Sequence, residues 1–263
     1  MQAEFGVIGG TGLYDPKLLK NIQEITIDTP YGKPSDAFTI GELGGRTVAF
    51  LPRHGKLHTI RPTDLNVRAN IWALKRLGVK RILAASTVGS LREDYAPGEI
   101  VFCDQFIDRT TRREQSFYSF AEGKVCHISV ADPMCPELHK TVIEVAKGLG
   151  IKMHETGIYV CIEGPRFSTK AESRMYQKWG AEVIGMTMVP EVVLAREAEI
   201  CYTNISTVTD YDCWKDHNVC VDDIVNIMRT NSENVKHIIA ETIAKTPSNC
   251  SCNCHSALEG AFA

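Results

Sequence analysis

The sequence predicts a single α/β domain, built on a mixed, mostly parallel β-sheet that is flanked by helices. Apolar runs rich in Val and Ile alternate with amphipathic stretches, as in strand–helix–strand units around a parallel sheet. The chain has 263 residues, 44% of them hydrophobic, which is enough for one large core. No repeat or low-complexity linker divides it. We therefore expect one domain over residues 1–245 and a cysteine-bearing tail over 246–263.

The expected elements follow from this pattern in chain order. Strands are expected where short apolar segments occur, at 5–8, 47–51, 81–85, 99–103, 158–162, 182–185 and 200–208. Helices are expected in the amphipathic segments at 65–77, 136–148, 168–179, 190–198 and 221–244. Pro190 suits a first helical turn, where no backbone N–H is needed. The last helix is long, and the tail follows it.

Charge and composition exclude several classes of partner. A formal net charge of -3 and a pI near 6.3 provide no basic surface for a nucleic-acid backbone. The N-terminus lacks the features of a signal peptide, and no apolar run approaches membrane length. We therefore expect a cytoplasmic protein that contacts neither nucleic acid nor membrane and binds a small neutral or anionic molecule.

Polar residues follow five of the expected strands at the point where each strand ends. They are Thr11 within GGTG (9–12), Arg53 and His54, Ser86 and Thr87, Thr187 after Met186, and Asp210 after Thr209. Ligands of open α/β sheets bind beyond the carboxyl ends of strands, so these residues could converge on one site.

The residue types in this set suit a free phosphate ion. Glycine amides and hydroxyls donate hydrogen bonds to anions, Arg53 can donate two parallel bonds, and His54 can add a further donor. A nucleoside triphosphate would normally need Mg²⁺ carboxylates and a lysine. His54 and His58 have the spacing of a metal pair on a helix, but Gly55 disfavours that helix, so no metal is expected.

Asp210 and Asp212 form an acidic pair after the apolar run 200–208. In an extended chain, residues two apart face the same side, roughly 6.5–7 Å from each other. The pair fits a metal site, a glycosidase pair or an acid with its orienting partner, and Asp is also common in turns and helix caps. Glycosidases need two opposed carboxylates and water rather than a phosphate site. Phosphate as the nucleophile together with a carboxylic acid indicates phosphorolysis of a glycosidic bond.

Ordered sequence blocks run along nearly the whole chain: GGTG (9–12), TPYGKPSD (29–36), RHG (53–55), NIWAL (70–74), DQFIDRT (104–110), IEGPRFS (162–168), TMVPEV (187–192) and TDYDCW (209–214). On these blocks the chain resembles the 5'-methylthioadenosine phosphorylases of the trimeric purine nucleoside phosphorylase family. The resemblance implies reversible phosphorolysis of 5'-methylthioadenosine, and also of adenosine, with residues 1–245 as the phosphorylase domain. It implies inorganic phosphate as co-substrate, no cofactor, and a homotrimer or a hexamer of paired trimers.

The resemblance also implies roles for individual residues. Phosphate would be bound by Thr11, Arg53, His54, Ser86, Thr87 and Thr187; ribose would lie near Met186; the purine would be held by Phe167, Ser168, Asp210 and Asp212; and His127 would reach a neighbouring subunit's site. Two regions depart from the family: Ser86 and Thr87 lie at variable positions, and the cysteine tail replaces residues that in some relatives cover the neighbour's methylthio pocket.

Asp210 is the expected proton donor to N7 and the partner of the 6-amino edge, with Asp212 orienting it. Cleavage of the N-glycosidic bond places negative charge on the purine, and a donor near neutral pH needs a pKa raised by burial or by a neighbouring carboxylate. The nearest alternative is a 6-oxopurine nucleoside or methylthioinosine phosphorylase, in which Asn usually stands at this position.

The ten cysteines support a second alternative, a redox or metal-binding interaction protein. Cys250, Cys252 and Cys254 have C-x-C-x-C spacing, which is not the C-x-x-C of ordinary zinc sites. Cys135 and Cys201 match cysteines of archaeal members of the resembled family that form disulfides. The resemblance therefore implies a bridge between these two and another within the tail.

Overall fold

A computed structural model describes residues 2–10, 19–118, 123–215 and 221–263 of the chain. Within these ranges, eleven strands form one sheet: β1 (Phe5–Gly9), β2 (Lys20–Ile25), β3 (Phe38–Leu43), β4 (Arg46–Pro52), β5 (Arg81–Ser90), β6 (Ile100–Val101), β7 (Gln105–Arg109), β8 (Met153–His154), β9 (Ile158–Ile162), β10 (Val183–Gly185) and β11 (Cys201–Asp210). The helices are α1 (Val67–Arg76), α2 (Pro136–Gly148), α3 (Lys170–Lys178), α4 (Met188–Glu197) and α5 (Val221–Lys245).

The sheet is mixed and mostly parallel, which confirms the predicted fold class. Its main path is β2-β3-β4-β1-β5-β10-β9-β7, and β11 pairs with β5 and β6. Strand β5 is parallel to both β1 and β11, whereas β10 is antiparallel to β5. The central strands β1, β5 and β11 therefore end at the same edge of the sheet.

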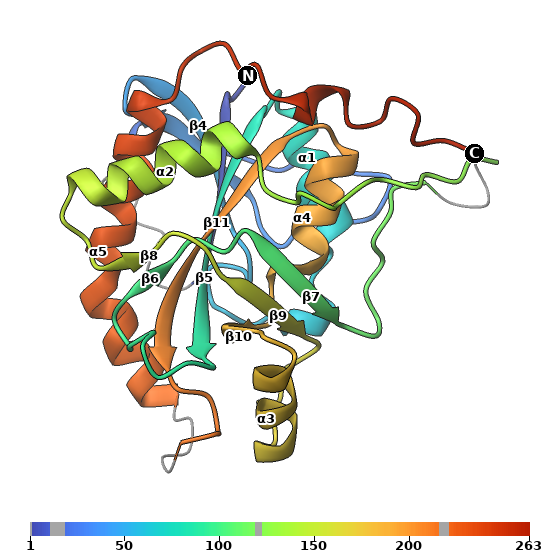
Figure 1. The fold of residues 1–263 in the computed structure, drawn as a ribbon. Coiled ribbons are helices and arrows are strands. Elements are labelled where there is room, and N and C mark those ends of the chain that lie inside the picture. The colour runs from blue at the N-terminus through green and yellow to red at the C-terminus, as the bar shows by residue number, and fades with distance from the viewer. Residues whose placement is uncertain (1, 11–18, 119–122, 216–220) are drawn as a thin grey trace.

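Two apolar cores lie on opposite faces of the sheet, as Figure 1 shows by the helices that cover them: α1 and α4 on one face, α2 and α5 on the other. Side chains of a strand alternate between faces. In β5, Ile82 and Ala84 join the core beneath α4, whereas Leu83 and Ala85 join the core that includes α2 and α5. The nearly continuous apolar runs of the central strands are thus explained by burial on both faces.

Every predicted strand and helix is present, but four strands were missed. Strand β2 is polar and largely exposed, and it pairs only with β3. Strands β3 and β7 mix polar and apolar residues, and β8 has only two residues. An apolar run is a weak guide to such strands because pairing at the edge of a sheet does not require burial of both faces.

Local sequence explains how several helices begin. Helix α2 matches the predicted bounds and has a proline in its first turn. Helix α3 begins with a capping box, in which Thr169 and Glu172 each accept a hydrogen bond from the other's backbone N–H. Helix α4 is interrupted at Val189, so its regular part begins at Pro190, as the sequence predicts.

The tail after α5 packs against the domain. Arg81 Nη2 donates to the carbonyl oxygens of Pro247 and Ser248, at 2.9 and 3.1 Å, and Cys252 and Cys254 are buried. The tail then pairs with the segment around residue 126 (Figure 1). Among the described residues, no helix combines the length and hydrophobicity that a membrane span requires.

Candidate functional site

Arg53 leaves the end of β4 and is held there by the neighbouring strand β1. Gly9 lies opposite Pro52, and the Arg53 N–H donates to the Gly9 carbonyl at 2.9 Å. The Arg53 side chain is only 1% exposed. A guanidinium group remains charged at such a position only where carboxylates or carbonyls compensate for the lost water.

Glu191 from α4 supplies that compensation. Its carboxylate accepts hydrogen bonds from Nε and Nη2 of Arg53, and Nη1 donates to the Ala85 carbonyl at 2.8 Å. Burial opposes the charged form, but the Glu191 carboxylate outweighs it and the pKa of Arg53 is raised. The bidentate pairing that the sequence suggested for phosphate is thus made with Glu191. Three of the five guanidinium N–H groups are used in these bonds, and the other two have no partner among the described residues and could bind a ligand.

His54 follows Arg53, and its tautomer is set by a backbone carbonyl. Nδ1 lies 2.8 Å from the Ile60 carbonyl oxygen, so Nδ1 carries the proton and donates. Burial, followed by the nearby Arg53 charge, lowers the pKa of His54 to about 4. At neutral pH, Nε2 is therefore an acceptor, not the donor expected from the sequence, and it suits a protonated phosphate oxygen. The segment 53–58 forms turns rather than a helix, so the helical metal-pair geometry of His54 and His58 does not occur.

Ser86 and Thr87 lie within β5 and do not follow it, which corrects the predicted strand end. Their side chains point to opposite faces because they are neighbours in a strand. Ser86 shares the α4 face with Ala84, and its hydroxyl lies 3.2 Å from Asn204 Oδ1 and 3.4 Å from Ser206 Oγ. The two hydroxyls therefore cannot address one ligand from the same face.

Thr187 and Met186 follow β10, and the antiparallel register brings them back alongside the middle of β5. Ile184 lies opposite Gly89, so the chain leaving β10 runs toward the level of Thr87. The Thr187 N–H donates to the Tyr159 hydroxyl at 3.3 Å, whereas Thr187 Oγ1 is buried and has no hydrogen-bond partner of normal geometry among the described residues. Buried hydroxyl groups normally have a partner, so this one is available to a ligand.

Asp210 is the last residue of β11 and is not beyond its end, which again corrects the expected boundary. A register shift places it beside Gly89 of β5. A Cβ on Gly89 would lie 2.9 Å from Asp210 Oδ1 and 3.2 Å from Asp212 Cβ. The acidic pair therefore needs glycine at position 89.

The two aspartates approach each other through a turn rather than through extended chain. Asp212 has φ +50°, and its N–H donates to Asp210 Oδ1 at 2.7 Å. Asp210 Oδ2 accepts from the Thr209 hydroxyl at 2.8 Å. Burial is the main cause that raises the pKa of Asp210, with a further contribution from Asp212, and burial likewise raises the pKa of Asp212. This agrees with the raised pKa that an acid donor requires.

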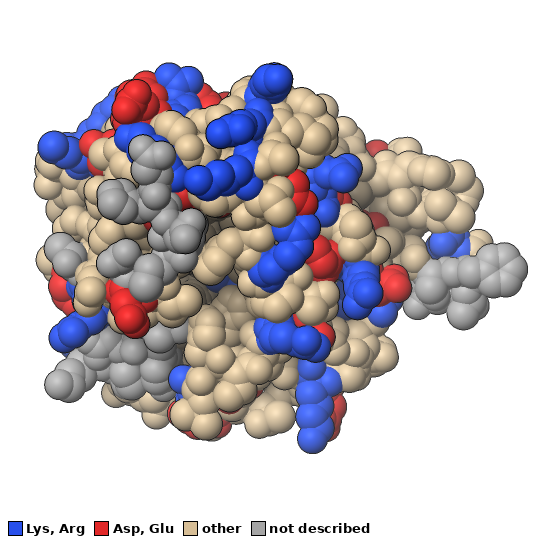
Figure 2. All heavy atoms as spheres, turned by 90° about the horizontal axis from the view of Figure 1, so that it is seen from below, with Lys and Arg blue, Asp and Glu red and all other residues tan. Residues whose placement is uncertain are grey.

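Phe167 and Ser168 lie between β9 and α3, and Ser168 is bonded to the residue that follows Asp212. Phe167 is 41% exposed, whereas Ser168 Oγ is buried and has no hydrogen-bond partner among the described residues. The Cys213 thiol donates to the Ser168 carbonyl at 3.0 Å and so connects this segment to Asp212. In Figure 2 the face seen from this end of the sheet is hollowed near its centre.

Three residues that support the site were missed by sequence reasoning. Glu191 holds Arg53, and Arg113 donates to the carbonyls of Met186 and Val189 at 2.7 and 2.5 Å. Glu163 accepts from the Thr111 N–H and the Thr63 hydroxyl; these bonds outweigh burial and lower its pKa to about 2. Both glutamates lie in sequence blocks that carry the family resemblance, IEGPRFS and TMVPEV, so these blocks could have identified them. Arg113 lies in none of the blocks.

Two further predicted residues are Thr11 and His127. Thr11 lies outside the described residues. His127 is exposed, and its N–H donates to the Ala261 carbonyl at 2.7 Å, beside the C-terminal tail. It therefore belongs to a different part of the surface of this chain.

The structure records each cysteine in the described part of the chain as free, so it does not contain the expected disulfides. Cys135, Cys201, Cys250 and Cys252 nevertheless lie together, with all four sulfur atoms within 4.8 Å of one another. The predicted proximity of Cys135 and Cys201 is thus present without the bond.

Comparison with known proteins gives a consistent result. A family model described as the phosphorylase superfamily matches residues 4–244. Proteins named S-methyl-5'-thioadenosine phosphorylase from Nitrosopumilus maritimus and Thermofilum pendens are 55% and 53% identical to the chain. The first match covers 98% of this chain and 97% of the relative, and the second covers 99% of both.

Solved structures also match this chain over nearly its whole length. A methylthioadenosine phosphorylase from Schistosoma mansoni in complex with adenine superimposes with a TM-score of 0.93 at 38% identity, covering 99% of this chain and 97% of that one. A methylthioadenosine phosphorylase from an antarctic soil metagenomic library gives the same TM-score at 42% identity, with 100% and 93% coverage.

Proposed function

The chain belongs to the phosphorylase superfamily, and from this premise we infer that its site cleaves S-methyl-5'-thioadenosine with inorganic phosphate. The products are adenine and 5-methylthioribose 1-phosphate, and the enzyme is a pentosyltransferase. Adenosine is a second substrate, because an apolar 5' pocket discriminates only weakly against an added hydroxyl.

The observation that carries this proposal is the half-buried Asp210 carboxyl with its raised pKa. A phosphate oxygen attacks C1' of the sugar while the C1'–N9 bond breaks, and its electron pair passes to the purine. Asp210 transfers its proton to N7, so the purine leaves as a neutral base. Asp212 orients Asp210 through the turn that joins them.

We assign phosphate to a group made of Thr11, Arg53, His54, Thr187 and one of the two neighbours Ser86 and Thr87. Support comes from the acceptor Nε2 of His54 and, within the described part of the chain, from two N–H groups of Arg53 and the Thr187 hydroxyl that have no partner there. Because Ser86 and Thr87 face opposite ways, only one of their hydroxyls takes part. Inorganic phosphate is a co-substrate, and no cofactor or metal is needed for this step.

We assign the ribose to Met186 and the purine to Phe167, Ser168, Asp210 and Asp212. Phe167 offers an exposed aromatic face, and Ser168 offers a hydroxyl that has no partner among the described residues. The Ser168 carbonyl is bonded to Cys213, next to Asp212. We further propose that the chain forms a trimer or a pair of trimers. The exposed position of His127 fits a role in a neighbouring subunit's site.

A substrate panel tests the proposal against its nearest alternative, a 6-oxopurine or methylthioinosine phosphorylase. The wild type should cleave methylthioadenosine and adenosine with phosphate, and inosine poorly. Asp210→Asn should lower kcat/KM for methylthioadenosine by about 10²–10⁴-fold, the range for loss of a general acid. It should lower the rate with methylthioinosine much less, because an amide can donate to a 6-carbonyl.

The readout is release of the free base for each nucleoside. Asp64→Asn, at an exposed ion pair with Arg61, is a matched loss of one charge and should not alter the preference. Intact adenine-nucleoside activity in Asp210→Asn would refute the proposed acid.

A further inference from the structure

Four cysteines from three distant parts of the chain meet at one point on the α2–α5 side of the sheet. Cys135 lies at the N-cap of α2, Cys201 is the first residue of β11, and Cys250 and Cys252 belong to the tail. Cys135, Cys201 and Cys252 are 1–5% exposed, and Cys250 is half-buried. The group is therefore nearly closed to solvent.

The four sulfur atoms form one compact group rather than two separate pairs. Cys252 Sγ lies 3.6 Å from Cys135 Sγ, 3.4 Å from Cys201 Sγ and 2.9 Å from Cys250 Sγ, and Cys201 Sγ lies 3.9 Å from Cys250 Sγ. Four thiolates around Zn²⁺, with Zn–S bonds of about 2.3 Å, have sulfur atoms about 3.8 Å apart. A disulfide needs a separation of about 2.05 Å.

We propose that Cys135, Cys201, Cys250 and Cys252 form a structural zinc site that ties the C-terminal tail to the domain. Each coordinating thiol loses its proton to solvent, and the four thiolates bind one Zn²⁺. Four protein ligands fill the coordination sphere, so the site is structural and has no open position for chemistry.

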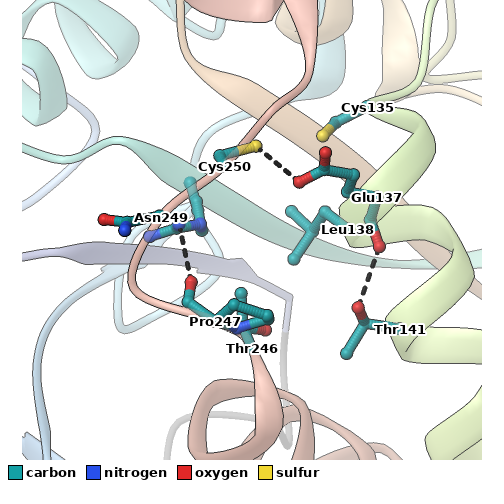
Figure 3. A pocket seen from close by; sticks show the side chains of 9 residues that line it. Cys135, Glu137, Leu138, Thr141, Thr246, Pro247, Asn249 and Cys250 are labelled. Carbon is teal, nitrogen blue, oxygen red and sulfur yellow. Dashed lines mark hydrogen bonds between the residues drawn. The ribbon is translucent and has the colours of Figure 1, made fainter.

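Two sources of positive charge lie beside this group of cysteines. The N-terminus of α2 carries a partial positive charge, and Cys135 caps it without any side-chain hydrogen bond to the helix. The guanidinium of Arg81 lines the same small pocket as Cys135 and Cys250. Figure 3 shows the sulfur atoms of Cys135 and Cys250 near the Glu137 carboxylate, with a hydrogen bond between Cys250 and Glu137.

Glu137 opposes metal binding only in part. Its carboxylate accepts a hydrogen bond from the Cys250 thiol, with 3.0 Å between sulfur and oxygen, and this bond is lost when the thiol ionises. The carboxylate keeps its bonds from the Ser251 N–H and hydroxyl. Because Glu137 is at the surface, water can screen its charge.

The zinc site is remote from the proposed reaction. Cys201 begins β11 and Asp210 ends it, which separates them by about 30 Å at 3.3 Å per residue. Loss of the metal should therefore lower thermal stability, because residues 246–263 lose one of their attachments to the domain, while kcat for methylthioadenosine stays unchanged below the unfolding temperature.

Metal analysis of the full-length protein, purified in a non-thiol reductant, tests the site. We expect one equivalent of zinc per chain, and cobalt substitution should give the visible absorption of tetrahedral thiolate coordination. Cys252→Ser and Cys250→Ser should each lower the metal content at least tenfold. Cys103→Ser, which removes an equally buried thiol outside the group, should retain it.

Three results would overturn the proposal. The reduced wild type could fail to bind added Zn²⁺, or Cys252→Ser could contain as much metal as the wild type. Peptide mapping of protein isolated without reductant could also find Cys135 joined to Cys201 by a disulfide. The wild-type titration needs no substitution, so a variant that fails to fold does not affect it.

Discussion

Asp210 shows how one carboxyl group acquires its role from its surroundings. An exposed aspartate has a pKa of about 3.9 and is ionised at neutral pH. In this fold burial raises the pKa of Asp210, and the Asp212 charge raises it further. The donor is active when protonated, so activity should fall as pH rises through the raised pKa.

Asp212→Asn should therefore move the high-pH limb of the kcat/KM profile for methylthioadenosine to lower pH. Removal of the Asp212 charge lowers the pKa of Asp210, whereas the Asn backbone can keep the N–H bond to Asp210 Oδ1. Initial rates across a pH series measure the shift, with Glu144→Gln on the exposed face of α2 as the charge-matched control. A limb that does not move would show that the two carboxyls are not coupled.

Arg53 and Glu191 are both about 1% exposed, and each is the main charge partner of the other. Loss of one partner leaves a buried charge uncompensated, which costs about 3–5 kcal/mol. Glu191→Gln keeps the size of the side chain but removes its charge. We expect it to lower the free energy of unfolding by about 3 kcal/mol and to raise KM for phosphate.

Chemical denaturation and phosphate-dependent kinetics measure these two effects. Glu144→Gln, whose partner Lys140 is also exposed, should change the free energy of unfolding by less than about 1 kcal/mol. Equal effects of the two substitutions would argue against a buried, mutually dependent pair.

At the level of elements, the end of β11 depends on a glycine in its neighbour β5. Gly89 has no left-handed backbone requirement, so its role is the space it leaves for Asp210. Gly89→Ala should displace the acidic pair and lower kcat/KM for methylthioadenosine by about 100-fold, as expected for a misplacement near 1 Å.

Gly148→Ala at the end of α2 is the matched control, because a Cβ there meets no atom within 4 Å. It should leave activity unchanged. Steady-state kinetics and thermal unfolding of both variants separate loss of position from loss of fold. Full activity in Gly89→Ala would mean that Asp210 tolerates displacement.

The reversed strand β10 also matters at this scale. The sequence predicts polar residues at the carboxyl ends of strands, but β10 runs antiparallel to β5. Met186 and Thr187 still approach the site because β5 extends to Ser90, beyond its predicted end. The register of β10 against β5, more than the direction of β10, brings these two residues near Thr87.

At the scale of the whole molecule, His127 lies on a segment that pairs with the tail and is exposed in one chain. If it completes a neighbour's site, His127→Ala and Asp210→Asn should both be weakly active alone. Dissociated, mixed and reassembled subunits should regain activity, because some sites then combine an intact Asp210 with an intact His127.

The measurement is methylthioadenosine cleavage before and after reassembly, with light scattering to establish that mixed oligomers form. Mixing Asp210→Asn with Asp212→Asn is the control, since both positions belong to the same chain's site and no intact site can form. Mixed oligomers without recovered activity would place His127 outside the neighbour's site.

Much of the fold could be predicted from the sequence. Periodicity gave the central strands and all five helices because burial on both sheet faces imposes long apolar runs. Edge strands such as β2 were missed because they remain exposed and bury little. In the candidate site, Arg53, Thr187 and Asp210 were found as polar residues that follow apolar segments where the expected strands end.

The sequence by itself determined the class of fold, the residue types of the site and the family to which the chain belongs. Only the tertiary structure decided which groups remain available. In the fold, Glu191 is bonded to one edge of the Arg53 guanidinium and His54 Nε2 is an acceptor. The side chains of Ser86 and Thr87 point to opposite faces of the sheet. The fold also gathered cysteines from α2, β11 and the tail into one group. The physical reason is that hydrogen bonds, burial and register depend on residues far apart in the chain, and local sequence patterns do not record those contacts.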